Sequence, residues 1–190
     1  MASPVYLALG DSMSIDDYTG VKRGGAVRQF HQWLGDRWRL DDRTFDGCRM
    51  QRVPTDGKGD VVTLTIGGND LLMARERYLS QGVDQFAKEH FELLDAVRSN
   101  NPKSLLIVGD VYAPHYPLSN EERAGLQAAN AVIRDNCDRV AARLAPINES
   151  FRGQEEDFLC LGIEPTLEGA SAMATLFREV FSQTMDERGI

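Results

Sequence analysis

Three short, nearly uninterrupted apolar segments stand out along the chain, at residues 5–9, 61–66 and 105–112. Each is rich in valine, leucine and isoleucine and is bounded by turn residues, which is typical of strands covered on both faces. Two further short strands are predicted at residues 42–45 and 145–148. The pattern therefore indicates a sheet with buried strands.

Between these strands, apolar positions recur three or four residues apart, the spacing of an amphipathic helix. The sequence Ser-Asn-Glu-Glu that starts at Ser119 is typical of the first turn of a helix. The predicted helices cover residues 26–38, 83–99, 119 to about 144, and 168–188. Strands that alternate with helices predict an α/β fold, in which a doubly wound parallel sheet carries helices on both faces. We expect one domain over residues 1–190, because the length is typical of one.

The charge balance of the chain restricts its partners. The sequence has 21 Lys and Arg against 29 Asp and Glu, a formal net charge of −8, and an acidic surface repels phosphate backbones and anionic lipids. No secretory signal pattern or membrane-spanning apolar run is recognisable. We therefore expect a cytoplasmic protein whose partner is a small molecule, with no nucleic acid and no membrane; the oligomeric state is not predicted.

Cysteine and histidine, the usual ligands of zinc in structural sites, are few and scattered. Cys48, Cys137 and Cys160 are far apart and form no Cys-x-x-Cys motif, and the chain has only three histidines. This spacing argues against a zinc site and a disulfide framework, so we interpret the cysteines as reduced thiols. We expect no metal and no cofactor.

Small and polar residues follow several of the predicted strands, where ligands bind in open α/β sheets. The segments are Gly10-Asp11-Ser12, Asp46-Gly47-Cys48 and Gly67-Gly68-Asn69-Asp70. A serine in a strand-to-helix turn exposes its hydroxyl close to backbone N–H groups, as acyl transfer requires. Each segment alone is also an ordinary turn sequence. Their joint occurrence after strands favours a catalytic site.

These motifs resemble the SGNH, or GDSL-type, hydrolase family. The resemblance includes Leu9-Gly10-Asp11-Ser12, Asp46-Gly47, the segment 65–71, and Pro165 followed by Gly169-Ala170. It implies a flavodoxin-like α/β/α sandwich with about five parallel strands, and hydrolysis of a small carboxylic ester through an acyl-serine intermediate. It further implies that Ser12 is the nucleophile and that Asp11 organises the turn. The oxyanion hole would consist of the Ser12 N–H, the Gly47 N–H and the Asn69 side-chain amide.

The last motif departs from the family pattern Asp-x-x-His-Pro. In the register set by Pro165 and Gly169, Glu164 stands at the position of the histidine and Leu161 at that of the aspartate. One interpretation is a pseudoenzyme, which keeps the fold and binds a small ligand in the same cleft without turnover. The other is that Glu164 is the general base.

Glu164 has the reach and the surroundings that a base needs. The same number of bonds separates Cα from Nε2 of histidine and from a carboxylate oxygen of glutamate. A carboxylate has no tautomer to fix, so an orienting aspartate is unnecessary. We expect the neighbours Cys160, Leu161 and Ile163 to exclude water from Glu164 and to raise its pKa towards that of a usable base.

His115 is a second candidate for the base, because it follows the third apolar strand on the side where the site is expected. The alternative is a loop residue that lines the cleft or packs between Tyr112 and Tyr116. The sequence shows no lid segment, which predicts an open cleft and small substrates.

Overall fold

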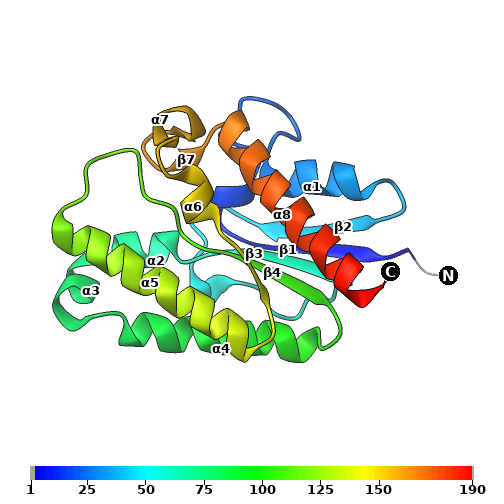
Figure 1. Cartoon of the computed structure of the whole chain (residues 1–190), viewed down its shortest axis with the longest axis horizontal. Helices are drawn as coiled ribbons and strands as arrows, with labels where there is room; N and C mark the ends of the chain where they lie inside the picture. Colours follow the sequence, from blue (N-terminus) through cyan, green and yellow to red (C-terminus); the bar gives the residue numbers. More distant parts are fainter. Residues whose placement is uncertain (1–2, 190) are drawn as a thin grey trace.

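The computed structural model describes residues 3–189 and confirms the predicted α/β architecture. A five-stranded parallel sheet with the order β2-β1-β3-β4-β5 lies between two layers of helices (Figure 1). The strands are β1 (Val5–Gly10), β2 (Arg39–Thr44), β3 (Val61–Thr65), β4 (Leu105–Gly109) and β5 (Arg143–Ala145). Two two-residue strands, β6 (Leu159–Cys160) and β7 (Glu164–Pro165), form a separate antiparallel pair.

Two sets of helices cover the two faces of the sheet (Figure 1). The first set is α1 (Ala26–Leu34), α6 (Ile147–Phe151) and α8 (Leu167–Arg188). The second set is α2 (Gly68–Met73), α3 (Arg75–Gln81), α4 (Asp84–Asn100) and α5 (Asn120–Arg139). The remaining short elements are α7 (Glu155–Phe158) and the 3-10 turns η1 (Ser12–Ser14) and η2 (Met50–Arg52). No helix within residues 3–189 combines the length and the apolarity needed to cross a membrane.

The side chains of the inner strands alternate between the two hydrophobic cores. On β1, Tyr6 and Ala8 point towards α1 and α8, whereas Leu7 and Leu9 point towards α4 and α5. All four are completely or almost completely buried. Burial on both faces explains why this strand reads as a continuous apolar run, without the alternation typical of a half-exposed strand.

The largest boundary error concerns the first helix and the second strand. The helix predicted to reach residue 38 ends at Leu34, because Gly35 follows with a φ of +90°. The second strand begins at Arg39 and not at residue 42. Its charged residues gave no apolar signal, because β2 is an edge strand and its side chains are only partly buried.

The boundaries around β4 and β5 also differ from the prediction. The strand predicted to reach residue 112 ends at Gly109, and the helix predicted to reach about residue 144 ends at Arg139. Ala141 has a φ of +52°, which no helix accommodates, and the chain then enters β5. The predicted strand at residues 145–148 is displaced accordingly, because α6 already begins at Ile147.

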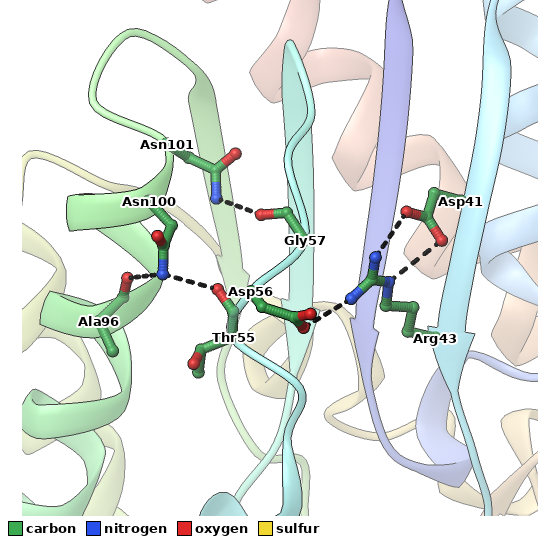
Figure 2. Close-up of polar contacts among 8 residues, drawn as sticks. All are labelled: Asp41, Arg43, Thr55, Asp56, Gly57, Ala96, Asn100 and Asn101. Atoms are coloured by element: carbon green, nitrogen blue, oxygen red, sulfur yellow. Dashed lines mark hydrogen bonds and ion pairs between the residues drawn. The ribbon is translucent and has the colours of Figure 1, made fainter.

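The segment that leads into β3 is held from two sides (Figure 2). On one side, the Asn101 side chain donates to the Gly57 carbonyl over 3.0 Å and accepts from the Gly59 N–H over 2.9 Å. On the other side, Arg43 of β2 forms ion pairs with Asp41 and with Asp56. The segment is therefore fixed against both α4 and the edge of the sheet.

Candidate active site

The strand order brings the three predicted motifs together at the carboxyl ends of the strands. Because β1 lies between β2 and β3, the segments that follow these strands are neighbours. Two hydrogen bonds connect them: the Phe45 N–H donates to the Gly10 carbonyl over 3.2 Å, and Asn69 Nδ2 donates to the Cys48 carbonyl over 3.0 Å. The motifs thus form one continuous surface at the carboxyl ends of the strands, as expected for an open α/β sheet.

The turn that presents Ser12 depends on a close backbone approach. Gly10 has a φ of +131°, and a Cβ at this position would lie 2.0 Å from the Thr65 carbonyl oxygen, so only glycine fits. The Asp11 N–H donates to the same carbonyl over 2.9 Å, and Asp11 Oδ1 accepts from the Met13 N–H over 3.1 Å. Asp11 therefore caps η1 and fixes Ser12 as its first residue.

Glu164 reaches Ser12 from a distant part of the chain. It lies in the β6–β7 hairpin, opposite Cys160, and β7 packs against η1. Immediately after it, Thr166 caps α8 by accepting from the Gly169 N–H over 3.2 Å. A Cβ on Gly169 would lie 2.3 Å from the carbonyl of Phe158, so this glycine allows α8 to begin against the hairpin. The residues that resemble the closing family motif thus fix the carboxyl group beside the serine.

The Glu164 carboxyl group is buried, with only 8% of the residue exposed. Burial raises its pKa above the ordinary value, the neighbouring Ser12 hydroxyl lowers it, and the negative charge of Asp46 raises it. Its Oε2 atom is buried and has no hydrogen-bond partner among residues 3–189. Within the described part of the chain, Glu164 Oε2 is therefore an acceptor without a bonded donor, in a carboxyl group that neighbours Ser12.

The sequence correctly indicated a raised pKa for Glu164, but one of the expected causes was wrong. Leu161 is 82% exposed at the tip of the hairpin, where it adopts a φ of +51°. It does not cover the carboxyl group. The exclusion of water comes from packing against η1 and from the surrounding cavity wall, which includes Ile163.

A second buried carboxyl group lies next to the serine. Burial raises the pKa of Asp11 well above its ordinary value, the Met13 N–H lowers it, and the charges of Glu164 and Asp70 raise it. The carboxyl groups of Asp11 and Glu164 therefore influence each other electrostatically. Ionising either group makes ionisation of the other less favourable.

Asp70 is a structural residue of the site to which sequence analysis assigned no role. Its Oδ2 accepts from the Met50 N–H over 3.1 Å, and its Oδ1 pairs with Arg49 Nε over 3.3 Å. The residue is 1% exposed, and burial raises its pKa, against the lowering effect of the Met50 and Arg49 hydrogen bonds. Asp70 thereby ties the start of α2 to the segment that contains Gly47. Its place within the Gly-Gly-Asn-Asp motif was the available signal.

An apolar cavity of about 280 Å³ opens beside Ser12 and Glu164. Its walls come from η1, from the α2–α3 region, from the segment 111–118, from α5 and from the β6–β7 hairpin. The apolar lining residues include Leu71, Leu72, Tyr78, Leu79, Val111, Tyr112, Pro114, Tyr116, Leu118, Leu126 and Ile163. The cleft expected from the sequence is a cavity whose walls include the short helices α2 and α3, which sequence analysis missed.

One ion pair interrupts the apolar wall of the cavity. Arg75 Nε of α3 contacts Glu122 Oε1 of α5 over 2.6 Å. Glu122 also completes the capping box of α5 with Ser119. The pair therefore links the two helices on either side of the cavity.

The other residues predicted for the site lie farther from the cavity. Gly47 is exposed with a φ of +66° and, unlike Asn69 and Ser12, is not a lining residue. His115 is also exposed and is not a lining residue; its backbone N–H donates to the Gly162 carbonyl over 2.7 Å. Within residues 3–189, no three His, Cys, Asp or Glu side chains are grouped so that they could hold a metal ion.

Comparison with protein families identifies this arrangement. Residues 8–172 match the model of the GDSL-like lipase/acylhydrolase family, and the match includes all the motifs that meet at the cavity. The chain belongs to this family. Its members are hydrolases. No curated protein matches the chain in sequence.

Solved structures share the fold over nearly the whole chain. The lipase Lip_vut3 from a goat rumen metagenome superimposes with a TM-score of 0.77 at 19% identity, covering 93% of this chain and 97% of that one. A lipolytic G-D-S-L family protein from Veillonella parvula gives 0.73 at 15% identity, with 94% and 97% covered. A variant of the acetyl xylan esterase Axe2 from Geobacillus stearothermophilus gives 0.68 at 15% identity, with 94% and 95% covered. These likenesses establish the common α/β/α fold.

Proposed function

We propose that this protein hydrolyses carboxylic esters through an acyl-serine intermediate, with Ser12 as nucleophile and Glu164 as general base. The observation that carries the proposal is the buried Glu164 Oε2, which lacks a hydrogen-bond partner within the described residues and lies in the cavity wall with Ser12. A raised pKa makes the carboxylate a stronger base than an exposed glutamate. Membership in a hydrolase family supports the same reaction.

The reaction requires two proton transfers at Glu164 in each of its two halves. As Ser12 Oγ forms its bond to the ester carbonyl carbon, the hydroxyl proton moves to the carboxylate. The resulting carboxylic acid then returns this proton to the alcohol oxygen as the carbon–oxygen bond of the ester breaks. In the second half, Glu164 takes a proton from water as the water oxygen attacks the acyl carbon. The bond between the acyl carbon and Ser12 Oγ then breaks, Glu164 returns the proton to Oγ, and the carboxylic acid leaves.

The negative oxygen of the tetrahedral intermediate requires hydrogen-bond donors. Ser12 and Asn69 both line the cavity, and Asn69 is neutral, so it donates without introducing a charge. One of the two hydrogens on Asn69 Nδ2 is donated to the Cys48 carbonyl, which leaves the second hydrogen for a ligand. We include the Gly47 N–H as a third donor, because the loop that contains Gly47 is bonded to Asn69 through the Cys48 carbonyl. Donors fixed in this way stabilise charge as it develops.

The cavity favours an acyl chain longer than acetyl. The structural relatives include a lipase and an acetyl xylan esterase, whose names imply acyl groups of very different length. In this chain leucine and tyrosine are the most frequent residues in the wall beside Ser12. Burying methylene groups there gains about 0.8 kcal/mol each. We therefore propose linear esters of medium chain length as substrates.

Ligand binding without turnover is the alternative function. It is favoured by one observation, that no histidine is among the residues lining the cavity. A site with a serine and oxyanion donors but without a competent base would bind an ester and leave it intact. The two functions differ in whether Ser12 becomes acylated.

Labelling with a fluorophosphonate and turnover of p-nitrophenyl butyrate and octanoate test the proposal directly. We expect stoichiometric labelling at Ser12 in the unmodified protein, and loss of labelling and turnover in Ser12→Ala. Ser14→Ala is the matched control, because Ser14 is also buried in η1 but bonds Thr65 Oγ1. In this control, both labelling and turnover should persist.

Glu164→Gln tests the base separately from the nucleophile. The substitution keeps the size of the side chain and removes its ability to accept a proton, so we expect turnover to fall by at least about 10²-fold. Glu168→Gln, an exposed change in the first turn of α8, is the control. Turnover of Glu164→Gln at the rate of the control would remove Glu164 from the mechanism. Absence of labelling between about pH 5 and 9 would establish the binding function instead.

A further inference from the structure

The hairpin that carries Glu164 has little support of its own. Its two strands are two residues long, and they belong to no larger sheet. The connecting turn contains Leu161 and Gly162, both with positive φ. An isolated two-stranded hairpin is at best marginally stable in water. The position of the Glu164 carboxyl group therefore depends on contacts from outside the hairpin.

The segment after β4 provides these contacts. The Tyr112 hydroxyl donates to the carbonyl of Ile163, the residue directly before Glu164, over 2.7 Å. Three residues later, the His115 N–H donates to the Gly162 carbonyl over 2.7 Å. Of these two bonds, the one from Tyr112 lies next to Glu164. Its donor is a side chain, which a substitution can remove without altering the backbone.

Tyr112 is itself held in place. The residue is 6% exposed, and its ring stacks on Phe151 of α6 with centroids 4.7 Å apart and an angle of 19°. Burial keeps the pKa of the hydroxyl well above its ordinary value, and the charges of Asp11 and Glu164 raise it further. The hydroxyl thus stays protonated and donates its hydrogen at every pH at which the enzyme would work. One face of the site is therefore anchored to the helix layer through a rigid aromatic side chain.

We propose that Tyr112 is a positioning residue, whose hydroxyl holds the Ile163 carbonyl and thereby fixes Glu164 against Ser12. This inference rests on the proposed function, because it concerns the base of that reaction. Tyr112 takes no part in proton transfer, since its hydrogen is committed to the Ile163 carbonyl. Its ring also lines the cavity, so the residue that borders the bound substrate also aligns the base.

Tyr112→Phe removes the hydroxyl and leaves the cavity wall intact. We expect kcat to fall by roughly 10²-fold while KM changes little, because a misplaced base slows the chemistry without removing substrate contacts. Tyr6→Phe is the matched control: Tyr6 is also buried, and its hydroxyl bonds Thr63 within the sheet over 2.8 Å. This control should keep the kcat of the unmodified enzyme.

The pH profile supplies a readout that loss of stability alone would not change. Burial raises the pKa of Glu164 and the Ser12 hydroxyl lowers it, so a carboxyl group that leaves its place beside Ser12 changes both effects and its pKa shifts. The acidic limb of kcat/KM in Tyr112→Phe should therefore be displaced from that of Tyr6→Phe. In the Glu164→Gln background, adding Tyr112→Phe should cause no further loss of kcat, because the group it positions is already inactive.

The inference is overturned if Tyr112→Phe matches Tyr6→Phe in kcat, if only its KM rises, or if its acidic limb stays in place. The proposed function fails in a different way, through turnover that survives Ser12→Ala or Glu164→Gln. Hydrogen exchange over residues 159–166 adds a readout independent of turnover. Exchange should be faster in Tyr112→Phe than in Tyr6→Phe, and equal exchange would also contradict the inference.

Discussion

The side-chain amide of Asn69 donates to the carbonyl oxygen of Cys48 over 3.0 Å and thereby connects two loops that follow different strands. The bond fixes the orientation of the amide, since only Nδ2 can donate to a carbonyl. The same loop is held a second time by Asp70, which bonds the Met50 N–H. The proposed oxyanion donor is therefore preorganised before a substrate arrives.

Replacing Asn69 by Ala should lower kcat by about 10²- to 10³-fold, the usual effect of losing one oxyanion donor. KM should change little, because the donor acts mainly on the charge that develops in the transition state. Steady-state kinetics with p-nitrophenyl butyrate measure both values, and the melting temperature shows whether loss of the Cys48 bond has loosened the loop. An increase in KM at constant kcat would show instead that Asn69 only shapes the cavity.

Asp46→Asn should shift the acidic limb of kcat/KM to lower pH. The negative charge of Asp46 raises the pKa of Glu164, so neutralising it lowers that pKa and leaves the base ionised at lower pH. Asp46 is exposed, so solvent and salt screen its charge, and the shift should be smaller than about one pH unit. The Asp56→Asn variant, which changes the carboxylate paired with Arg43, provides the control. A shift that persists unchanged in high salt would contradict the electrostatic explanation.

Glu164→Gln should stabilise the fold at neutral pH while it impairs turnover. The pKa of Glu164 is raised in the folded state, mainly by burial, so the folded state holds its proton more tightly than the unfolded state. Stability is then lost as pH rises from the ordinary glutamate pKa through the folded value. The neutral glutamine avoids this loss. Urea unfolding should show the gain at about pH 7 and little difference at about pH 4, with Glu168→Gln as the exposed control.

Gly125→Leu should shift the substrate preference towards short acyl chains. Gly125 of α5 lines the cavity, and no heavy atom lies within 4 Å of the position of a Cβ added there. A leucine fits the helix and projects into the space proposed for the acyl chain. We expect kcat/KM for the octanoate ester to fall at least about tenfold relative to acetate. In Gly125→Ala, which favours the helix equally but fills less space, the ratio should change little. Equal loss for both esters would place the acyl chain elsewhere.

Much of the fold was predictable because its inner strands are buried on both faces. The run at residues 61–66 is so apolar that β3 was located almost to the residue. The edge strand β2 was misplaced because Arg39, Asp41 and Arg43 are charged and only partly buried or exposed, so they do not form an apolar run. Strand prediction from apolar runs therefore works for the centre of this sheet and fails at its edge.

The sequence indicated the turns that carry the candidate site residues, but it did not indicate the cavity or the contacts that hold the hairpin. The turns at Ser12 and Asn69 follow from glycine-rich sequence next to apolar strands, and the family resemblance drew attention to Glu164. The cavity and the anchoring of the hairpin by Tyr112 depend on contacts across 51 residues of sequence, which no local pattern encodes. Leu161 illustrates the limit: its apolar character suggested burial, yet it is exposed at a turn with positive φ.

The charged edge of the sheet has a consequence for the behaviour of the protein at high concentration. Arg43 pairs with Asp41 and Asp56, while Asp42 pairs with Arg28 of α1 (Figure 2 shows the first group). A second molecule that added a strand beside β2 would have to strip water from these charges without replacing their partners. Sheet edges protected in this way resist intermolecular strand pairing. The same charges that concealed β2 from apolar pattern analysis therefore protect the folded protein against aggregation.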